Sequence, residues 1–67
     1  MKVKDLMSKI VDSYGCIIFT NEKDENRDFI LYPHDTSSSS IPHRILNSEV
    51  VLITLYFNQM SIVFRED

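Results

Sequence analysis

The chain has 67 residues, of which 43% are hydrophobic and 25% are charged, and this composition excludes a disordered chain. A length of this order supports one domain with a small core, because such domains bury only about 60% of their unfolded surface. Seven basic residues against ten acidic ones give a net charge of −3, which argues against binding to nucleic acid or to anionic lipid. We therefore expect a single globular domain over residues 1–67.

The first predicted element is an amphipathic helix of about three turns. Apolar side chains recur at helical spacing over residues 3–14, with polar side chains on the opposite side. Gly15, the only glycine, follows directly, where a left-handed C-terminal cap would use it.

Two short strands and a single helical turn are predicted next. Residues 16–20 and 29–32 are rich in β-branched and aromatic side chains, and the polar residues 21–28 between them predict a hairpin with a long loop. The polar segment at 34–40, with four consecutive serines, predicts a connecting loop. Residues 41–47 predict one helical turn, with Pro42 near its start and Ile41, Ile45 and Leu46 facing inward.

The C-terminal third predicts a second hairpin, with strands at 49–57 and 60–66. With Asn58 and Gln59 as the turn, the inward positions on both strands are all apolar, which favours this register over a slip of one residue. This register places Phe57 opposite Met60, Leu55 opposite Ile62 and Ile53 opposite Phe64, with Val51 also inward. The fold class predicted is α+β: an N-terminal helix packed on a mostly antiparallel four-stranded sheet, in the order helix, strand, strand, short helix, strand, strand.

The predicted sheet carries apolar side chains on both faces, and only one main helix is available to cover them. The face of the last hairpin turned away from the core includes Leu52, Tyr56, Val63 and Arg65. Exposed apolar patches usually mark partner surfaces, and Tyr and Arg are side chains that interfaces favour. We therefore predict partner binding through these four residues. The alternative is that loops of the same chain cover this face.

The polar loop of the first hairpin supplies a second candidate contact, formed by the acidic residues Glu22, Asp24, Glu25 and Asp28. It would steer association towards a basic partner, and added salt would then slow that association. The loop partly matches a calcium-binding loop, but Phe29 occupies the position where that motif needs a glycine. A solvated hairpin loop without metal is the preferred interpretation.

Catalytic and metal-binding patterns are not found in the sequence. Cys16, His34 and His43 lack the close pairing that zinc sites use, and the serines at 37–40 lack the Gly-x-Ser-x-Gly turn. A single glycine also excludes the glycine-rich loops that hold phosphates. We predict a protein that is not an enzyme, with no catalytic residue, no metal ligand and no cofactor.

The single cysteine favours a reducing compartment, because small secreted domains usually need disulfides. No signal peptide or membrane span is recognised in the sequence. We therefore expect a cytoplasmic protein that does not bind membranes.

The chain resembles small accessory proteins encoded by bacteriophages and mobile elements of low-GC Gram-positive bacteria. The similarity lies in pattern and composition: the opening segment Met1-Lys2-Val3-Lys4-Asp5-Leu6, the lead Ile45-Leu46-Asn47-Ser48-Glu49-Val50 and the ending Ile62-Val63-Phe64-Arg65-Glu66. The resemblance implies a bacterial host and a stoichiometric role, such as that of anti-CRISPR proteins and other inhibitors of host defence nucleases. It assigns no functional residue.

Three functions follow as hypotheses. The first is a non-catalytic module that binds a larger host protein, such as a defence effector that itself binds nucleic acid, or a regulatory factor. The alternative is a homodimer that buries the same sheet face or pairs a free edge strand. The third is single-stranded nucleic-acid binding on an aromatic platform of Phe19, Tyr32 and Tyr56, which the acidic balance argues against.

Overall fold

The computed structural model describes residues 1–9, 15–32 and 41–66. Its elements, in chain order, are α1 (Val3–Lys9), β1 (Cys16–Asn21), β2 (Arg27–Leu31), α2 (His43–Leu46), β3 (Glu49–Tyr56) and β4 (Gln59–Arg65). This order confirms the predicted α+β fold. The predicted helical positions at 10–14 and the predicted loop at 34–40, with His34 and the serines, lie outside the described residues.

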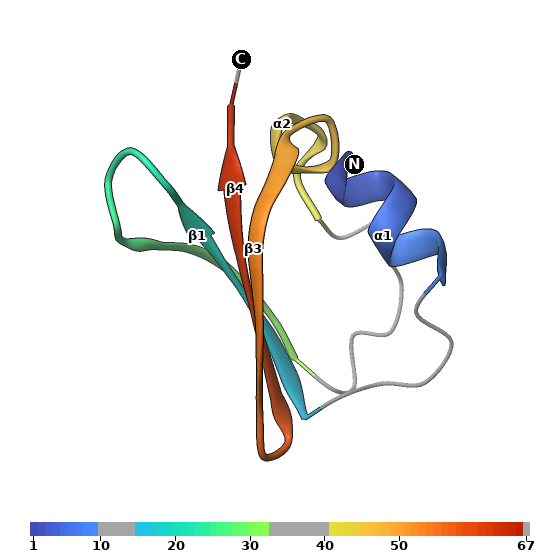
Figure 1. The fold of residues 1–67 in the computed structure, drawn as a ribbon, viewed down its shortest axis with the longest axis vertical. Helices are drawn as coiled ribbons and strands as arrows, with labels where there is room; N and C mark the ends of the chain where they lie inside the picture. Colours follow the sequence, from blue (N-terminus) through green and yellow to red (C-terminus); the bar gives the residue numbers. More distant parts are fainter. Residues whose placement is uncertain (10–14, 33–40, 67) are drawn as a thin grey trace.

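The four strands form one mixed sheet in the order β2-β1-β4-β3. Each hairpin is antiparallel, and the two hairpins join through a parallel pairing of β1 with β4. The sheet is therefore mostly antiparallel, as predicted, with β2 and β3 at its edges. In Figure 1 the sheet is seen close to edge-on, and both helices lie on the same side of it.

The core lies between the sheet and the helices. Its buried side chains come from every element except β3, and from Ile41 just before α2: Val3, Ile17, Phe19, Leu31, Ile41, Ile45, Met60, Ile62 and Phe64. Along β4 these residues alternate with more exposed ones, which is the period expected of a strand with one face on the core. Ile41 and Ile45 are buried as predicted, and Leu46 packs against the core while staying half-buried.

Ser48, the one buried polar side chain among the described residues, joins α2 to β3. Its hydroxyl donates to the Arg44 carbonyl at 2.6 Å, and its amide donates to the Ile45 carbonyl at 3.0 Å. Its hydrogen-bonding groups are thus satisfied despite burial, which removes the cost of taking them from water.

The last hairpin forms, but its predicted register is wrong by two residues. The turn consists of Phe57 and Asn58, so that Leu55 lies opposite Met60 and Ile53 lies opposite Ile62. Asn58 has a φ of 61°, a left-handed conformation that asparagine tolerates better than glutamine does. The shift is even, so Ile53 and Leu55 keep the predicted face, whereas Phe57 is 96% exposed in the turn.

The inward position predicted for Val51 is also wrong. The pairing with β4 is interrupted between Val50 and Leu52, which leaves Val51 out of register as a β-bulge. Val50 consequently packs against the core in its place, and Val51 is exposed.

Gly15 is not the left-handed helix cap that the sequence predicts, because its φ is not positive. It is needed for a close approach between two backbone segments. A Cβ at this position would lie 2.0 Å from the Asn58 carbonyl oxygen, and the Cys16 amide donates to that same oxygen at 3.2 Å. Gly15 therefore allows the start of β1 to contact the β3–β4 turn.

Replacing this glycine should destabilise the fold. In Gly15→Ala the new methyl meets backbone rather than a flexible side chain, so we expect a loss of about 1–3 kcal/mol in the free energy of unfolding. Urea denaturation followed by circular dichroism measures this loss, with Lys4→Ala on the exposed side of α1 as a control near wild type. An unchanged midpoint for Gly15→Ala would contradict the close approach.

Candidate functional site

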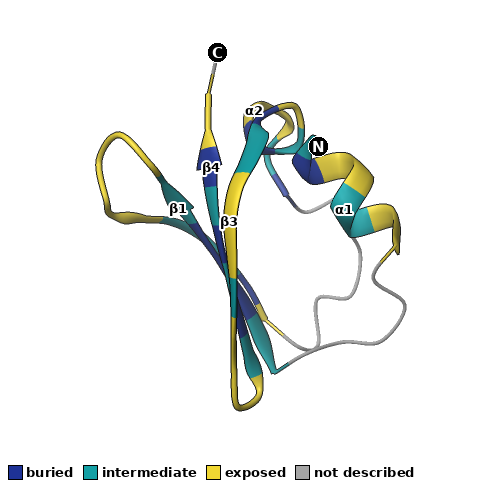
Figure 2. Ribbon diagram, viewed as in Figure 1, coloured by how far each residue is buried: buried dark blue, intermediate teal, exposed yellow. Residues whose placement is uncertain are grey.

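Exposed apolar side chains concentrate on β3 and its turn. The β3 strip, as we name it, consists of Val51, Leu52, Ile53, Leu55, Tyr56 and Phe57, and each of these side chains is more than a third exposed. Figure 2 shows exposed residues along much of β3 beside the more deeply buried β4. This concentration makes the β3 strip a candidate contact surface.

The pairing with β4 separates the β3 strip into two faces. Ile53 and Leu55 lie opposite the buried Ile62 and Met60, so they are on the face that the helices occupy. Leu52, Thr54 and Tyr56 lie opposite Val63, Ser61 and Gln59, on the outer face of the sheet. Because β3 is an edge strand, even its helix-side residues are incompletely covered, and Leu55 is 60% exposed.

The outer face brings together three of the residues predicted to bind a partner. Leu52 and Tyr56 are both more than half exposed, and Val63, directly opposite Leu52, is half-buried. On β1 and β2, Ile18 and Ile30 lie opposite each other, but Ile18 is buried and Ile30 is half-buried, so the exposed apolar side chains of this face are those of β3. No described element covers this face, since both helices lie on the other side (Figure 1).

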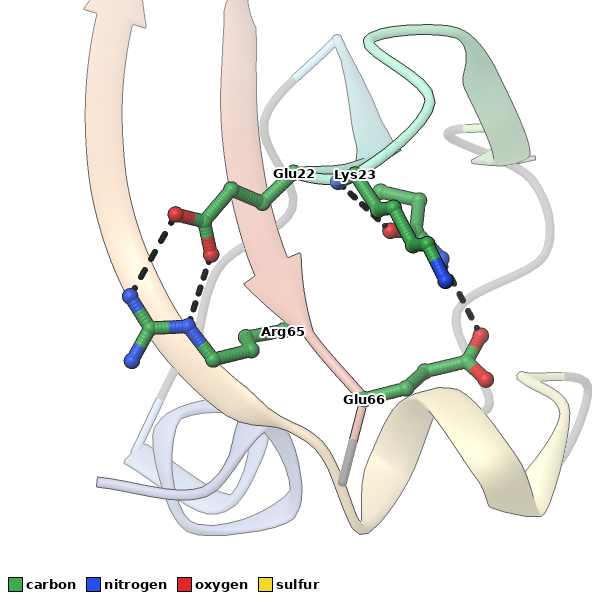
Figure 3. A pocket seen from close by; sticks show the side chains of 5 residues that line it. Glu22, Lys23, Arg65 and Glu66 are labelled. Atoms are coloured by element: carbon green, nitrogen blue, oxygen red, sulfur yellow. Dashed lines mark hydrogen bonds and ion pairs between the residues drawn. The ribbon is translucent and has the colours of Figure 1, made fainter.

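The fourth predicted outer-face residue, Arg65, is joined to the acidic loop. Its Nε donates to Glu22 Oε2 at 2.7 Å and its Nη2 to Glu22 Oε1 at 3.3 Å, as Figure 3 shows. These hydrogen bonds lower the pKa of the Glu22 carboxyl below its ordinary value. The two contact regions predicted separately therefore meet at this ion pair.

Asp28 is held within the chain by Arg44 of α2. It lies at the β1–β2 irregularity, out of register with β1, and its Oδ2 accepts from Arg44 Nη1 at 2.9 Å. Arg44 Nη1 also donates to Glu66 Oε1 at 2.8 Å, and Asn21 Nδ2 donates to that same oxygen at 3.2 Å. The hydrogen bonds from Arg44 lower the pKa of Asp28. This network ties β2, α2 and the end of β4 together, so Asp28 has a structural partner.

The remaining predicted acidic residues, Asp24 and Glu25, are exposed in the β1–β2 loop. Glu25 adopts a φ of 57°, and its amide donates to the Asn21 carbonyl at 2.8 Å, which closes the loop tightly. They lie in a different element from Leu52 and Tyr56, and the structure does not bring the two pairs into one constellation.

The alternation of side chains along residues 53–57 predicts that Ile53, Leu55 and Phe57 face inward, so their exposure is not expected from the sequence. A signal was present: residues 50–57 are apolar except for Thr54, whereas the predicted helices offer too little surface to cover both faces of such a strand.

A shallow hollow of about 500 Å³ lies at the charged end of the sheet, lined by Asn21, Glu22, Lys23, Arg65 and Glu66 (Figure 3). Glu22 and Arg65 neutralise each other there, and Glu66 is paired with Arg44. Across the described residues, no three His, Cys, Asp or Glu side chains gather as metal ligands would.

No protein-family model, curated protein or solved structure matches the chain. Neither helix in the described part of the chain is long and apolar enough to cross a membrane.

The ion pairs predict a stability that falls in acid. The pKa values of Glu22, Asp28 and Glu49 are lowered in the folded state, so their contribution is present above the unfolded values, near 4, and is lost as the pH falls through the folded ones. Arg44→Met should therefore flatten the decrease in the free energy of unfolding between about pH 5 and pH 2.

Lys23→Met is the matched control, because it removes one positive charge from the same end of the sheet and leaves the Arg44 pairs in place. Urea denaturation at a series of pH values and low salt measures both variants, since salt weakens exposed pairs. Equal pH dependence of Arg44→Met and wild type would contradict a role for these pairs.

Proposed function

We propose that the chain is a non-catalytic protein-binding module that docks through the outer face of its sheet. Its centre is formed by Leu52, Tyr56 and Val63. The observation that carries this proposal is the position of exposed apolar side chains on a face that no described element covers. Burying such side chains against another protein is favourable, at about 25 cal/mol per Å² of apolar surface removed from water.

The shape and composition of this face support a macromolecular partner rather than a small ligand. Small-molecule sites enclose most of their ligand, whereas the apolar groups here lie on strands of an open sheet face. Tyr56 offers a large, rigid anchor, and the Arg65–Glu22 pair provides a polar border at the other end of β4.

The partner that fits this surface is a larger protein with an apolar patch and basic residues near it. The net charge of −3 and the exposed Asp24 and Glu25 favour a basic neighbourhood, which would speed encounter at low salt. The resemblance to phage and mobile-element proteins suggests a host defence or regulatory factor as the target, bound stoichiometrically as anti-CRISPR proteins bind theirs.

Two neighbouring residues provide a sharp test, because they have similar exposure on opposite faces of β3. Tyr56 is 57% exposed on the outer face, and Leu55 is 60% exposed on the helix side. In a tagged pull-down from a low-GC Gram-positive host, Tyr56→Glu should capture at least ten-fold less partner than wild type, because the substitution buries a charge at the contact.

Leu55→Glu is the matched control and should retain the partner within a few-fold. Circular dichroism first establishes that both variants are folded. Equal retention by the two variants would exclude the outer face as the contact, and equal loss would show that binding does not distinguish the two faces.

A further inference from the structure

We propose that two copies of the chain pair antiparallel along their β3 edges, about a two-fold axis at Thr54. The pairing would join two four-stranded sheets into one sheet of eight strands. This inference goes beyond the proposed function, because it concerns the edge of the sheet rather than its outer face. It also assigns the helix-side half of the β3 strip, which the proposed function leaves unused.

The edge of β3 already accepts a strand at its beginning. The Val3 amide donates to the Ser48 carbonyl at 2.9 Å, the Val50 amide donates to the Met1 carbonyl at 2.8 Å, and Lys2 pairs antiparallel with Glu49. An ion pair of 3.2 Å between the Met1 amino group and Glu49 holds this short pairing. Beyond Val50, no strand of the described chain pairs with this edge. Within the described part of the chain, residues 51–57 therefore present an unpaired edge, which is a template for another strand.

Hairpin geometry identifies the backbone groups at that edge. A two-residue turn is closed by a hydrogen-bonded pair, here Tyr56 with Gln59, and such pairs recur at every second residue. Thr54 therefore bonds inward to β4, and the amides and carbonyls of Ile53 and Leu55 point to the open edge. The start of β3 agrees, because the outward Val50 amide is followed by the bulge at Val51, which shifts the alternation by one residue.

A two-fold axis at Thr54 makes this edge self-complementary. Ile53 then lies opposite Leu55 of the second copy and exchanges both backbone hydrogen bonds with it. Leu52 lies opposite Tyr56 of the second copy. Thr54 lies opposite Thr54 of the second copy, and such Thr–Thr pairs across strands are favourable in sheets. With this axis, Phe57 in the turn of the second copy lies opposite Val51, next to Met1, which bonds to Val50. Met1 therefore prevents the second copy from sliding further towards the start of β3.

Charge and burial favour a second copy over a foreign strand. Residues 50–64 contain no charged side chain, so the symmetric pairing brings no like charges together despite the net charge of −3. A two-fold axis perpendicular to the sheet keeps both helix sides on one face, so that Ile53 and Leu55 of each copy cover those of the other. The same symmetry brings Leu52 and Tyr56 of both copies together on one outer face.

A charge-swap experiment tests the axis directly. Thr54→Lys and Thr54→Glu each place like charges opposite each other, and an equimolar mixture of the two variants places opposite charges there. By light scattering we expect wild type near twice its 7.9 kDa monomer mass, each variant alone near 7.9 kDa, and the mixture near twice that mass again. Restoration by mixing also shows that both variants fold.

A wild-type mass of 7.9 kDa at the highest soluble concentration would overturn the inference, as would a dimeric wild type whose variants stay dimeric when alone. Leu55→Pro removes one outward amide and leaves the β4 ladder intact, so a folded Leu55→Pro dimer would also overturn it. A monomer that still captures a partner through Tyr56 would leave the proposed function standing. A dimer that captures nothing would support the pairing and contradict the proposed function.

Discussion

The parallel pairing of β1 with β4 is the interaction on which the rest of the structure depends. It sets Ile17 and Phe19 beside Met60 and Ile62, which forms the centre of the core. It also makes the chain between these strands return across the side where the helices lie, since parallel neighbours need a crossover. The two outer strands, β2 and β3, are left as edges. Gly15 secures the beginning of this pairing, because only a residue without a side chain lets β1 approach the carbonyl of Asn58.

The sequence predicts the helices and strands well, because periodicity and turn residues act locally. The parallel pairing of β1 with β4 is not encoded locally. Strand positions follow from alternation, yet neither hairpin specifies which strands of the two hairpins meet. The register that the sequence predicts for the last hairpin is wrong for a related reason. Residues 50–57 are apolar on both faces, so burial alone discriminates weakly between registers, and the preference of Asn58 for a left-handed conformation decides. Arg44 likewise pairs with acids 16 and 22 residues away, beyond the reach of local spacing rules.

The candidate site shows the same division between local and distant information. Leu52, Tyr56 and Val63 follow from two-residue periodicity and lie together on the outer face. The exposure of Ile53 and Leu55 depends on β3 being an edge strand, which only the strand order reveals. Of the acidic residues, Glu22 and Asp28 are held by the chain's own arginines and help to fix the charged end of the sheet. The exposed apolar side chains of the described chain are therefore concentrated on β3 and its turn.

The central claim is that the β3 edge is completed by a second copy, and amide hydrogen exchange across a concentration series tests it most directly. The account predicts that the Ile53 and Leu55 amides exchange rapidly in dilute solution and become protected as the concentration rises. The Thr54 amide, bonded within the hairpin, should be protected at every concentration. Exchange of Ile53 and Leu55 that is rapid at all concentrations would contradict the account, because their backbone groups would then have only water as a partner.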